Sequence, residues 1–271
     1  MTNGMVGPMV PPDEVTLPSG RGMPLLGFGT WQITGEEAVR ATAAALAAGY
    51  RHLDTAHVYE NEGEVGRGIR ESGVPRDDIF ITTKIPPGRA GQHRETLEQS
   101  LELLGTDHVD LWLIHWSVDD DVHADLWRAL QQARSDGRAR DIGVSNYSVP
   151  QLDRLADLTG ELPAVNQIEW SPLLFDRSVL AAHRDRGVVL EGYSGLRGGV
   201  LEHETVVGIA RKLGRTPAQV VIRWHLEHGV VAIPKSREPD RVRANADVGA
   251  FTLDPADMAA LDALGVHPEP G

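Results

Sequence analysis

Four polar residues of types that transfer protons stand close behind short apolar stretches of the sequence. Asp54, Lys84 and His115 each end such a stretch, and Tyr59 follows Asp54 in Asp54-Thr55-Ala56-His57-Val58-Tyr59. A phenol has a pKa near ~10, and a neighbouring ammonium lowers it because the positive charge favours the phenolate. A buried carboxylate would in turn keep the lysine charged. The four side chains therefore predict a general acid tuned toward neutral pH.

The elements that must position these residues follow a strand–helix repeat. The expected strands are Leu25–Gly29, Tyr50–Asp54, Ile79–Lys84, Val109–His115, Ala139–Ser145, Ala164–Glu169, Val188–Ser194 and Val230–Lys235. The expected helices are Glu36–Ala48, Glu62–Glu71, Glu95–Leu104, Ala124–Ser135, Pro150–Leu158, Ser178–Asp185, Glu204–Leu213, Pro217–Glu227, Asp240–Ala246 and Pro255–Leu264. Nearly continuous apolar strands are typical of a parallel sheet covered on both faces.

Eight such units in 271 residues predict an α/β fold, the (β/α)8 TIM barrel. The alternative is an open doubly wound sheet, whose G-x-G-x-x-G fingerprint is incomplete here. Glu14–Leu17 and Met23–Leu25 flank a turn sequence and predict an N-terminal β-hairpin that plugs the bottom of the barrel. We expect residues 1–12 to form a flexible tail and residues 13–271 to form one barrel domain.

Composition narrows the possible partners. The formal net charge is -13, so the chain has no general attraction for nucleic acid or anionic membranes. The absence of cysteine excludes disulfides, thiolate nucleophiles and Cys-ligated zinc. His225 and His228 are spaced like a metal pair but lack a third ligand, so no metal site is predicted.

With neither an export signal nor a long apolar run, we expect a cytoplasmic protein, and we expect it to be a monomer.

The active site of a barrel lies at the carboxyl ends of its strands. The polar residues at the later strand ends are Ser145, Asn146, Gln167, Glu169, Tyr193, Ser194, Lys235 and Ser236. Trp31 and Trp116 follow strands near the same rim. Together with Val58, they predict the apolar wall of a substrate pocket.

Seven short motifs lie in order along nearly the whole chain: Gly27–Trp31, Asp54–Glu62, Ile81–Lys84, Leu113–Trp116, Ile142–Tyr147, Asn166–Glu169 and Ile233–Ser236. Through them the sequence resembles the aldo-keto reductase family, and most closely its bacterial 2,5-diketo-gluconate-reductase-like branch. The resemblance implies an NADPH-dependent reductase of aldehydes and ketones. Tyr59 would protonate the carbonyl oxygen, Lys84 and Asp54 would tune it, and His115 would orient the carbonyl.

The same resemblance implies the residues that bind NADPH. Ser145, Asn146 and Gln167 would hold the carboxamide, and Tyr193 would stack on the nicotinamide ring. Further cofactor contacts are implied at Ser194, Lys235, Ser236, Arg241 and Asn245, with Lys235, Ser236 and Arg241 around the 2′-phosphate. Cations and a hydroxyl together make a phosphate site even in an acidic protein.

Some segments depart from the family pattern, and two other functions compete. Gly195 stands where the family commonly has proline and is expected to loosen its loop. The loop Ser117–Asp121 is short, so we expect an open mouth and broad specificity. One competing function is a non-catalytic NADPH-binding sensor or partner-binding barrel. The other is an aldolase-like barrel that forms a Schiff base on Lys84, which needs a depressed lysine pKa.

Overall fold

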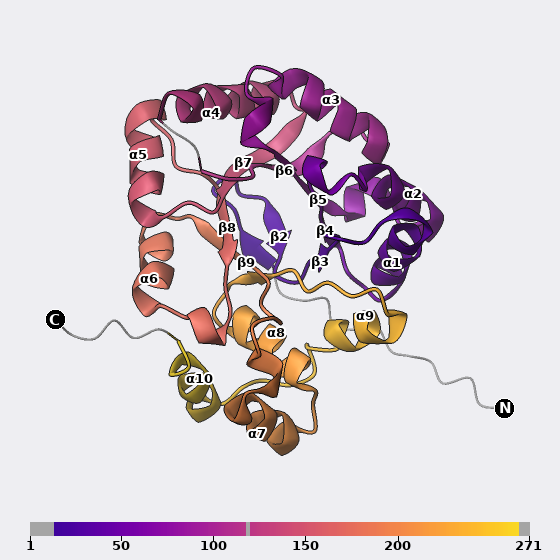
Figure 1. Cartoon of the computed structure of the whole chain (residues 1–271), viewed down its shortest axis with the longest axis vertical. Helices are drawn as coiled ribbons and strands as arrows, with labels where there is room; N and C mark the ends of the chain where they lie inside the picture. The colour runs from indigo at the N-terminus through magenta and orange to yellow at the C-terminus, as the bar shows by residue number, and fades with distance from the viewer. Residues whose placement is uncertain (1–13, 118–119, 266–271) are drawn as a thin grey trace.

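The computed structural model describes residues 14–117 and 120–265, so the expected tail 1–12 lies outside the described residues. Figure 1 shows a ring of strands enclosed by helices. The strands are β3 (Phe28–Gly29), β4 (His52–Asp54), β5 (Phe80–Ile85), β6 (Val109–Ile114), β7 (Ala139–Ser145), β8 (Val165–Glu169), β9 (Val189–Tyr193) and β10 (Val231–Ala232). Each strand pairs in parallel with the next along the chain.

The ring closes between its first and last strands. Leu26 forms a parallel bridge with Ala232, and the Gly27 amide donates to the Ala232 carbonyl at 2.8 Å. The Gly29 amide donates to the carbonyl of Pro234 at 3.2 Å. A Cβ on Gly29 would lie 2.9 Å from the Ile233 carbonyl oxygen, so only glycine lets the two segments approach this closely. The predicted (β/α)8 barrel is therefore confirmed.

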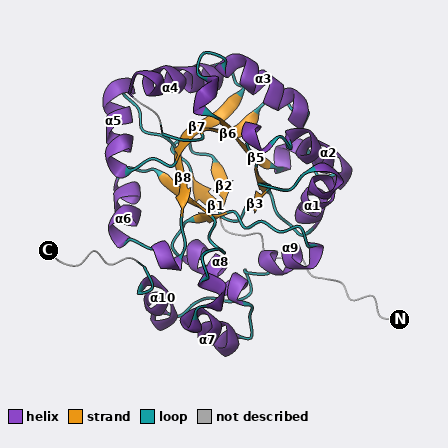
Figure 2. Ribbon diagram, viewed as in Figure 1, coloured by secondary structure: helices purple, strands orange, loops and turns teal. Residues whose placement is uncertain are grey.

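The helices form the outer ring in Figure 2. They are α1 (Gly35–Ala47), α2 (Glu62–Ser72), α3 (His93–Leu104), α4 (Asp120–Ser135), α5 (Val149–Thr159), α6 (Arg177–Asp185), α7 (Glu204–Leu213), α8 (Pro217–Glu227), α9 (Pro239–Ala246) and α10 (Pro255–Asp262). Thr216 caps α8 as its sequence predicts, because its hydroxyl accepts a hydrogen bond from the Gln219 amide at 3.2 Å.

Six of the eight barrel strands are shorter than the sequence predicts, β3 and β10 most of all. β3 begins only at Phe28, and β10 ends at Ala232 rather than at Lys235. The proline at position 234 has no amide hydrogen and so cannot extend the ladder of β10. Lys235 therefore lies in the loop that follows the strand, not on it.

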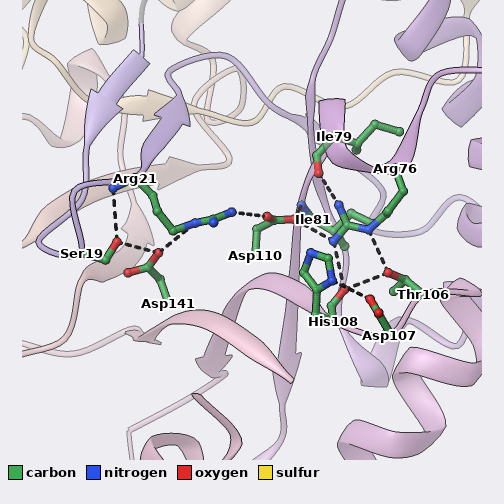
Figure 3. A network of polar contacts seen from close by, with 10 residues as sticks. All are labelled: Ser19, Arg21, Arg76, Ile79, Ile81, Thr106, Asp107, His108, Asp110 and Asp141. Carbon is green, nitrogen blue, oxygen red and sulfur yellow. Dashed lines mark hydrogen bonds and ion pairs between the residues drawn. The ribbon is translucent and has the colours of Figure 1, made fainter. Parts of the chain in front are cut away.

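The predicted hairpin consists of β1 (Glu14–Thr16) and β2 (Gly22–Pro24), paired antiparallel. Its turn lies against the amino-terminal ends of β6 and β7 (Figure 3). The Arg21 guanidinium donates to the Asp110 carboxylate at 2.8 Å, and Ser19 donates to Asp141 at 3.0 Å. Arg76 donates to the other oxygen of Asp110 at 2.8 Å. This network closes the end of the barrel opposite to the carboxyl ends of the strands.

We expect Asp110→Ala to lower the free energy of unfolding by about 2–3 kcal/mol, because it leaves two arginines without their shared buried carboxylate. The matched control is Asp125→Ala, which removes an exposed pair with Arg128 and should cost less than about 0.5 kcal/mol. Urea denaturation measures both changes. Equal losses in the two variants would contradict the assignment.

Candidate active site

A cavity of about 410 Å³ opens at the carboxyl ends of the strands. It is lined by Gly29, Trp31, Asp54, Val58, Tyr59, His115, Trp116, Ser145, Asn146, Gln167, Tyr193, Ser194, Gly195, Leu196, Arg197, Ile233, Pro234 and Lys235. These include all the residues predicted for the site except Lys84, Ser236, Arg241 and Asn245. Its wall carries the exposed side chains of Trp31, Trp116 and Val58, at 42%, 53% and 48% exposure.

An ion pair lies beneath this cavity. The Lys84 ammonium, on β5, donates to both carboxylate oxygens of Asp54 on β4, at 2.8 and 2.7 Å, and to the Thr55 carbonyl at 2.8 Å. The lysine side chain is fully buried. Burial alone would lower the pKa of Lys84, but Asp54 more than offsets this and the pKa is raised. The lysine is therefore charged and already has three partners, which is the opposite of what a Schiff base requires.

Tyr59 ends the short helix η1 (His57–Tyr59) that follows β4, and its ring faces this pair. The Lys84 ammonium lies 5.2 Å from the ring centroid, and the His115 ring meets it edge-on at 5.7 Å. The expected lowering of the Tyr59 pKa is wrong as a net effect, because burial raises it and Lys84 offsets only part of the rise. Tyr59 is therefore a protonated phenol at neutral pH.

His115 follows β6, and its amide is fixed by a hydrogen bond to the Ile85 carbonyl at 3.0 Å. Burial and the nearby charge of Lys84 lower the pKa of His115 to about 3. The imidazole is therefore neutral and keeps one N–H that can donate. Its buried Nδ1 has no hydrogen-bond partner among the described residues.

The amide and hydroxyl side chains on the later strands hold one another in place. Tyr193 donates to the Asn146 side-chain oxygen at 2.7 Å, and Asn146 donates to the Ser145 hydroxyl at 2.9 Å. The Gln167 amide donates to Asp54 at 2.9 Å, which connects this group to the ion pair. Asn146 has a φ of 63°, a strained conformation for a non-glycine residue that aims its side chain across the strand ends.

Two cations face the cavity without an ion pair among the described residues. The Arg197 guanidinium lies 4.8 Å above the Trp31 ring. Burial, Arg237 and Arg197 together lower the pKa of Lys235. Arg237 is itself paired with Glu37 at 3.4 Å. Sequence reasoning missed Arg197 as a site residue, although its place just beyond the carboxyl end of β9 was a usable signal.

Three predicted cofactor contacts lie outside the cavity lining. Ser236 accepts a hydrogen bond from the Glu238 amide at 3.1 Å, just ahead of α9. Arg241 is exposed on the first half of α9, and Asn245 is buried on the same helix. Their roles toward a cofactor remain predictions. A ligand reaching them would have to extend from the cavity past Lys235 and along α9.

Gly195 does not act as a loosening residue, which corrects the expectation from the sequence. A Cβ at this position would lie 2.9 Å from the His225 ring and 3.2 Å from the Trp170 carbonyl oxygen. The backbone of the loop thus packs against α8 too tightly for any side chain. It is Ser194, with a φ of 57°, that takes the unusual conformation at this turn.

The two histidines considered as a metal pair have structural partners. His225 bonds the Val221 and Trp170 carbonyls at 2.8 and 3.1 Å, and His228 pairs with Asp262 at 2.7 Å. Within residues 14–117 and 120–265, no three His, Cys, Asp or Glu side chains gather as metal ligands would. In the same residues, no helix has the length and apolar character to cross a membrane.

The site thus offers a protonated phenol and a neutral imidazole to one cavity, over a lysine that is not free to act as a nucleophile. The phenol and the imidazole suit a reaction at a carbonyl group in which the protein supplies the proton. The model of the aldo/keto reductase family matches residues 25–266, and the chain belongs to that family. It is an oxidoreductase that acts on carbonyl groups with a nicotinamide cofactor.

Known relatives can be aligned with nearly the whole chain, in sequence and in structure. The methylglyoxal reductase DkgA of Yersinia pestis is 41% identical over 254 residues, 92% of each protein. An aldo/keto reductase structure from Brucella melitensis superposes with a TM-score of 0.89 at 42% identity, covering 93% of this chain and 98% of that one. A Bombyx mori aldo-keto reductase in complex with NADP has a TM-score of 0.88 at 31% identity, covering 94% of each chain. The resemblance to this family and to its bacterial branch is confirmed.

We expect His115 to stay neutral from about pH 5 to pH 9, because its pKa is lowered to about 3. Nitrogen NMR of histidine-labelled protein, with the His115→Gln variant to assign the signal, measures its protonation directly. A midpoint near the ordinary histidine value of about 6.5 would show that the ring is not desolvated as described.

Proposed function

We propose that this protein reduces aldehydes and ketones to alcohols, with a hydride from NADPH and the proton from Tyr59. The observation that supports this most is the buried Lys84–Asp54 pair beneath a phenol that lines the cavity. When bound, the nicotinamide cofactor supplies the hydride. The protein's own residues then have to hold the carbonyl, deliver a proton to its oxygen and exclude water.

Tyr59 and His115 would share the substrate oxygen as two neutral donors. As negative charge develops on that oxygen, the phenolic O–H bond breaks and the proton moves to it, which leaves a phenolate. The ammonium of Lys84 stabilises this phenolate because it is fixed near the ring and cannot be neutralised while Asp54 holds it. Lys84 and Asp54 therefore act on the proton without touching the substrate.

The cavity suits a nicotinamide dinucleotide on two observations. Arg197 and Lys235 have no carboxylate partner among the described residues, and phosphate groups would supply one. Polar side chains on β7, β8 and β9 could bind the nicotinamide. The hydroxyl of Ser145 and the amides of Asn146 and Gln167 would bind its carboxamide, and the aromatic face of Tyr193 would stack on its ring. Ser194, Ser236, Arg241 and Asn245 complete the set of proposed cofactor contacts.

The non-catalytic alternative uses the same cavity and predicts binding without turnover. The pairing of Lys84 with Asp54 beside Tyr59 favours catalysis, because mere binding needs no charged pair under a phenol. Turnover of any aldehyde would exclude the alternative. We also propose that the protein is a cytoplasmic monomer, which light scattering and cell fractionation test.

Tyr59→Phe should abolish reduction and leave NADPH binding nearly unchanged, because the variant loses the proposed proton donor but keeps the ring. Losing a general acid costs roughly 10²–10⁴ in rate. Turnover of 4-nitrobenzaldehyde and quenching of protein fluorescence by NADPH measure the two properties. Reduction at the wild-type rate would disprove the assignment of the acid.

We expect NADPH to bind more tightly than NADH, through Lys235 and Arg241. Removing a charge-assisted contact with phosphate costs about 1.5–3 kcal/mol, roughly ten- to a hundredfold in affinity. Lys235→Ala and Arg241→Ala should each weaken NADPH and leave NADH little changed, and the double variant should show the larger loss. The control is Arg211→Ala on α7, which lies outside the cavity lining. Equal losses for both cofactors would assign the two cations a structural role.

The apolar wall points to small aromatic and dicarbonyl substrates rather than polar sugars. Trp31 and Trp116 present exposed rings to the cavity, which favours flat substrates by about 1–2 kcal/mol of burial. Trp31→Ala and Trp116→Ala should therefore lower kcat/KM for phenylglyoxal-like compounds and nitrobenzaldehyde. Leu174→Ala, an exposed apolar residue outside the cavity lining, is the control. A preference for a single sugar acid, with the aromatics ignored, would refute this specificity.

A further inference from the structure

Glu191 is a buried acidic residue inside the barrel that the proposed mechanism does not use. It is the middle residue of β9, beside Gln167 on β8 and Val231 on β10 in the strand register. Its side chain is fully buried, and its carboxyl oxygen lies 3.7 Å from Nε2 of the equally buried His52 on β4. Glu191 therefore lies within the barrel, close to the layer that holds the Asp54–Lys84 pair.

Other buried carboxyl groups of this protein have hydrogen-bond donors, and Glu191 does not. Glu62 accepts from the hydroxyls of Thr83 and Ser100 at 2.6 and 2.9 Å. Asp54 accepts from Lys84 through both of its oxygens. Neither oxygen of Glu191 has a hydrogen-bond partner among the described residues. An ionised carboxylate in such a place is strongly unfavourable, whereas a protonated carboxyl group is tolerated.

The surrounding charges lead to the same protonation state. Five polar or charged side chains face Glu191: His52 and Asp54 from β4, Lys84 from β5, Tyr59 from η1 and Gln167 from β8. The other neighbouring strand, β10, has only the apolar residues Val231 and Ala232. Burial and Lys84 lower the pKa of His52 to about 3, so it carries no positive charge. The only ammonium in this group is already held by Asp54.

The pKa of Glu191 accordingly rises. Burial and the charge of Asp54 raise it to about 8, against the smaller opposing effects of Gln167 and Lys84. The Gln167 side-chain amide lies beside Glu191 on the neighbouring strand, but it does not form a hydrogen bond of standard geometry with the Glu191 carboxyl group. The carboxyl group therefore carries its proton at neutral pH and loses it under mildly alkaline conditions.

We propose that Glu191 is a positioning residue for the proton transfer proposed above, on which this inference rests: as a neutral carboxylic acid, it leaves the ammonium of Lys84 to Asp54 and Tyr59. Ionised Glu191 places a second negative charge near Lys84. That charge opposes the phenolate and raises the pKa of Tyr59 further, which makes the phenol a weaker proton donor. Reduction should therefore weaken as Glu191 ionises.

The kinetic test compares kcat for aldehyde reduction from about pH 6 to pH 10 in the wild type and in Glu191→Gln. The wild type should lose activity on the alkaline side with a midpoint near pH 8. Glu191→Gln keeps a neutral polar group, so its activity at about pH 6.5 should persist and its midpoint should move up by about one pH unit or more. The control is Glu62→Gln, which removes a different buried carboxyl group and should leave the midpoint in place. An alkaline midpoint that is unchanged in Glu191→Gln would overturn the proposal.

Infrared spectroscopy supplies a readout that does not need turnover. A band from a protonated carboxyl group should be present at neutral pH, disappear with a midpoint near pH 8 and be missing in Glu191→Gln, or in Glu191→Met if the first variant does not fold. Absence of any such band in the wild type would overturn the proposal. A protein that shows the band but reduces no carbonyl compound would instead disprove the proposed function.

Discussion

The buried pair of Lys84 and Asp54 is the interaction on which the rest of the site depends. A lysine without solvent contact is stable only if its charge is matched, and here two carboxylate oxygens and one carbonyl do so. The pair in turn affects every titratable neighbour. Burial lowers the pKa of His115 and Lys84 lowers it further. Lys84 also offsets part of the rise that burial causes in the Tyr59 pKa, and Asp54 adds to the rise that burial causes in the Glu191 pKa.

Only a closed barrel brings these groups together. Asp54, Lys84, Gln167 and Glu191 come from four strands, and the Gln167–Asp54 hydrogen bond joins residues 113 positions apart in the chain. An open sheet would place β4 and β8 too far apart for that contact. At the opposite end of the barrel, the hairpin is joined to β6 and β7 through Asp110 and Asp141.

The sequence predicted the barrel and most of the cavity lining because both depend on a simple repeat. Polar residues stand at or just beyond the ends of seven of the eight expected strands, and a barrel gathers these ends at one rim. The sequence could not predict effects that depend on burial depth. The raised pKa of Tyr59 and the tight packing at Gly195 both result from neighbours distant in the chain. Arg197 was missed as a site residue because a charged loop residue is usually solvated. Its place beyond the carboxyl end of β9 indicated the rim, but its contact with the Trp31 ring depends on the fold.

The barrel closes through few hydrogen bonds, between the segment from Leu25 to Gly29 and the segment from Ala232 to Pro234. The loops that continue from these two segments carry Trp31 on one side of the closure and Lys235 on the other, and both line the cavity. A molecule that fills the cavity therefore contacts both sides of the closure and joins them. Because the molecule binds the folded barrel, its binding energy adds to the free energy of unfolding. The more tightly it binds, the more strongly the barrel resists unfolding.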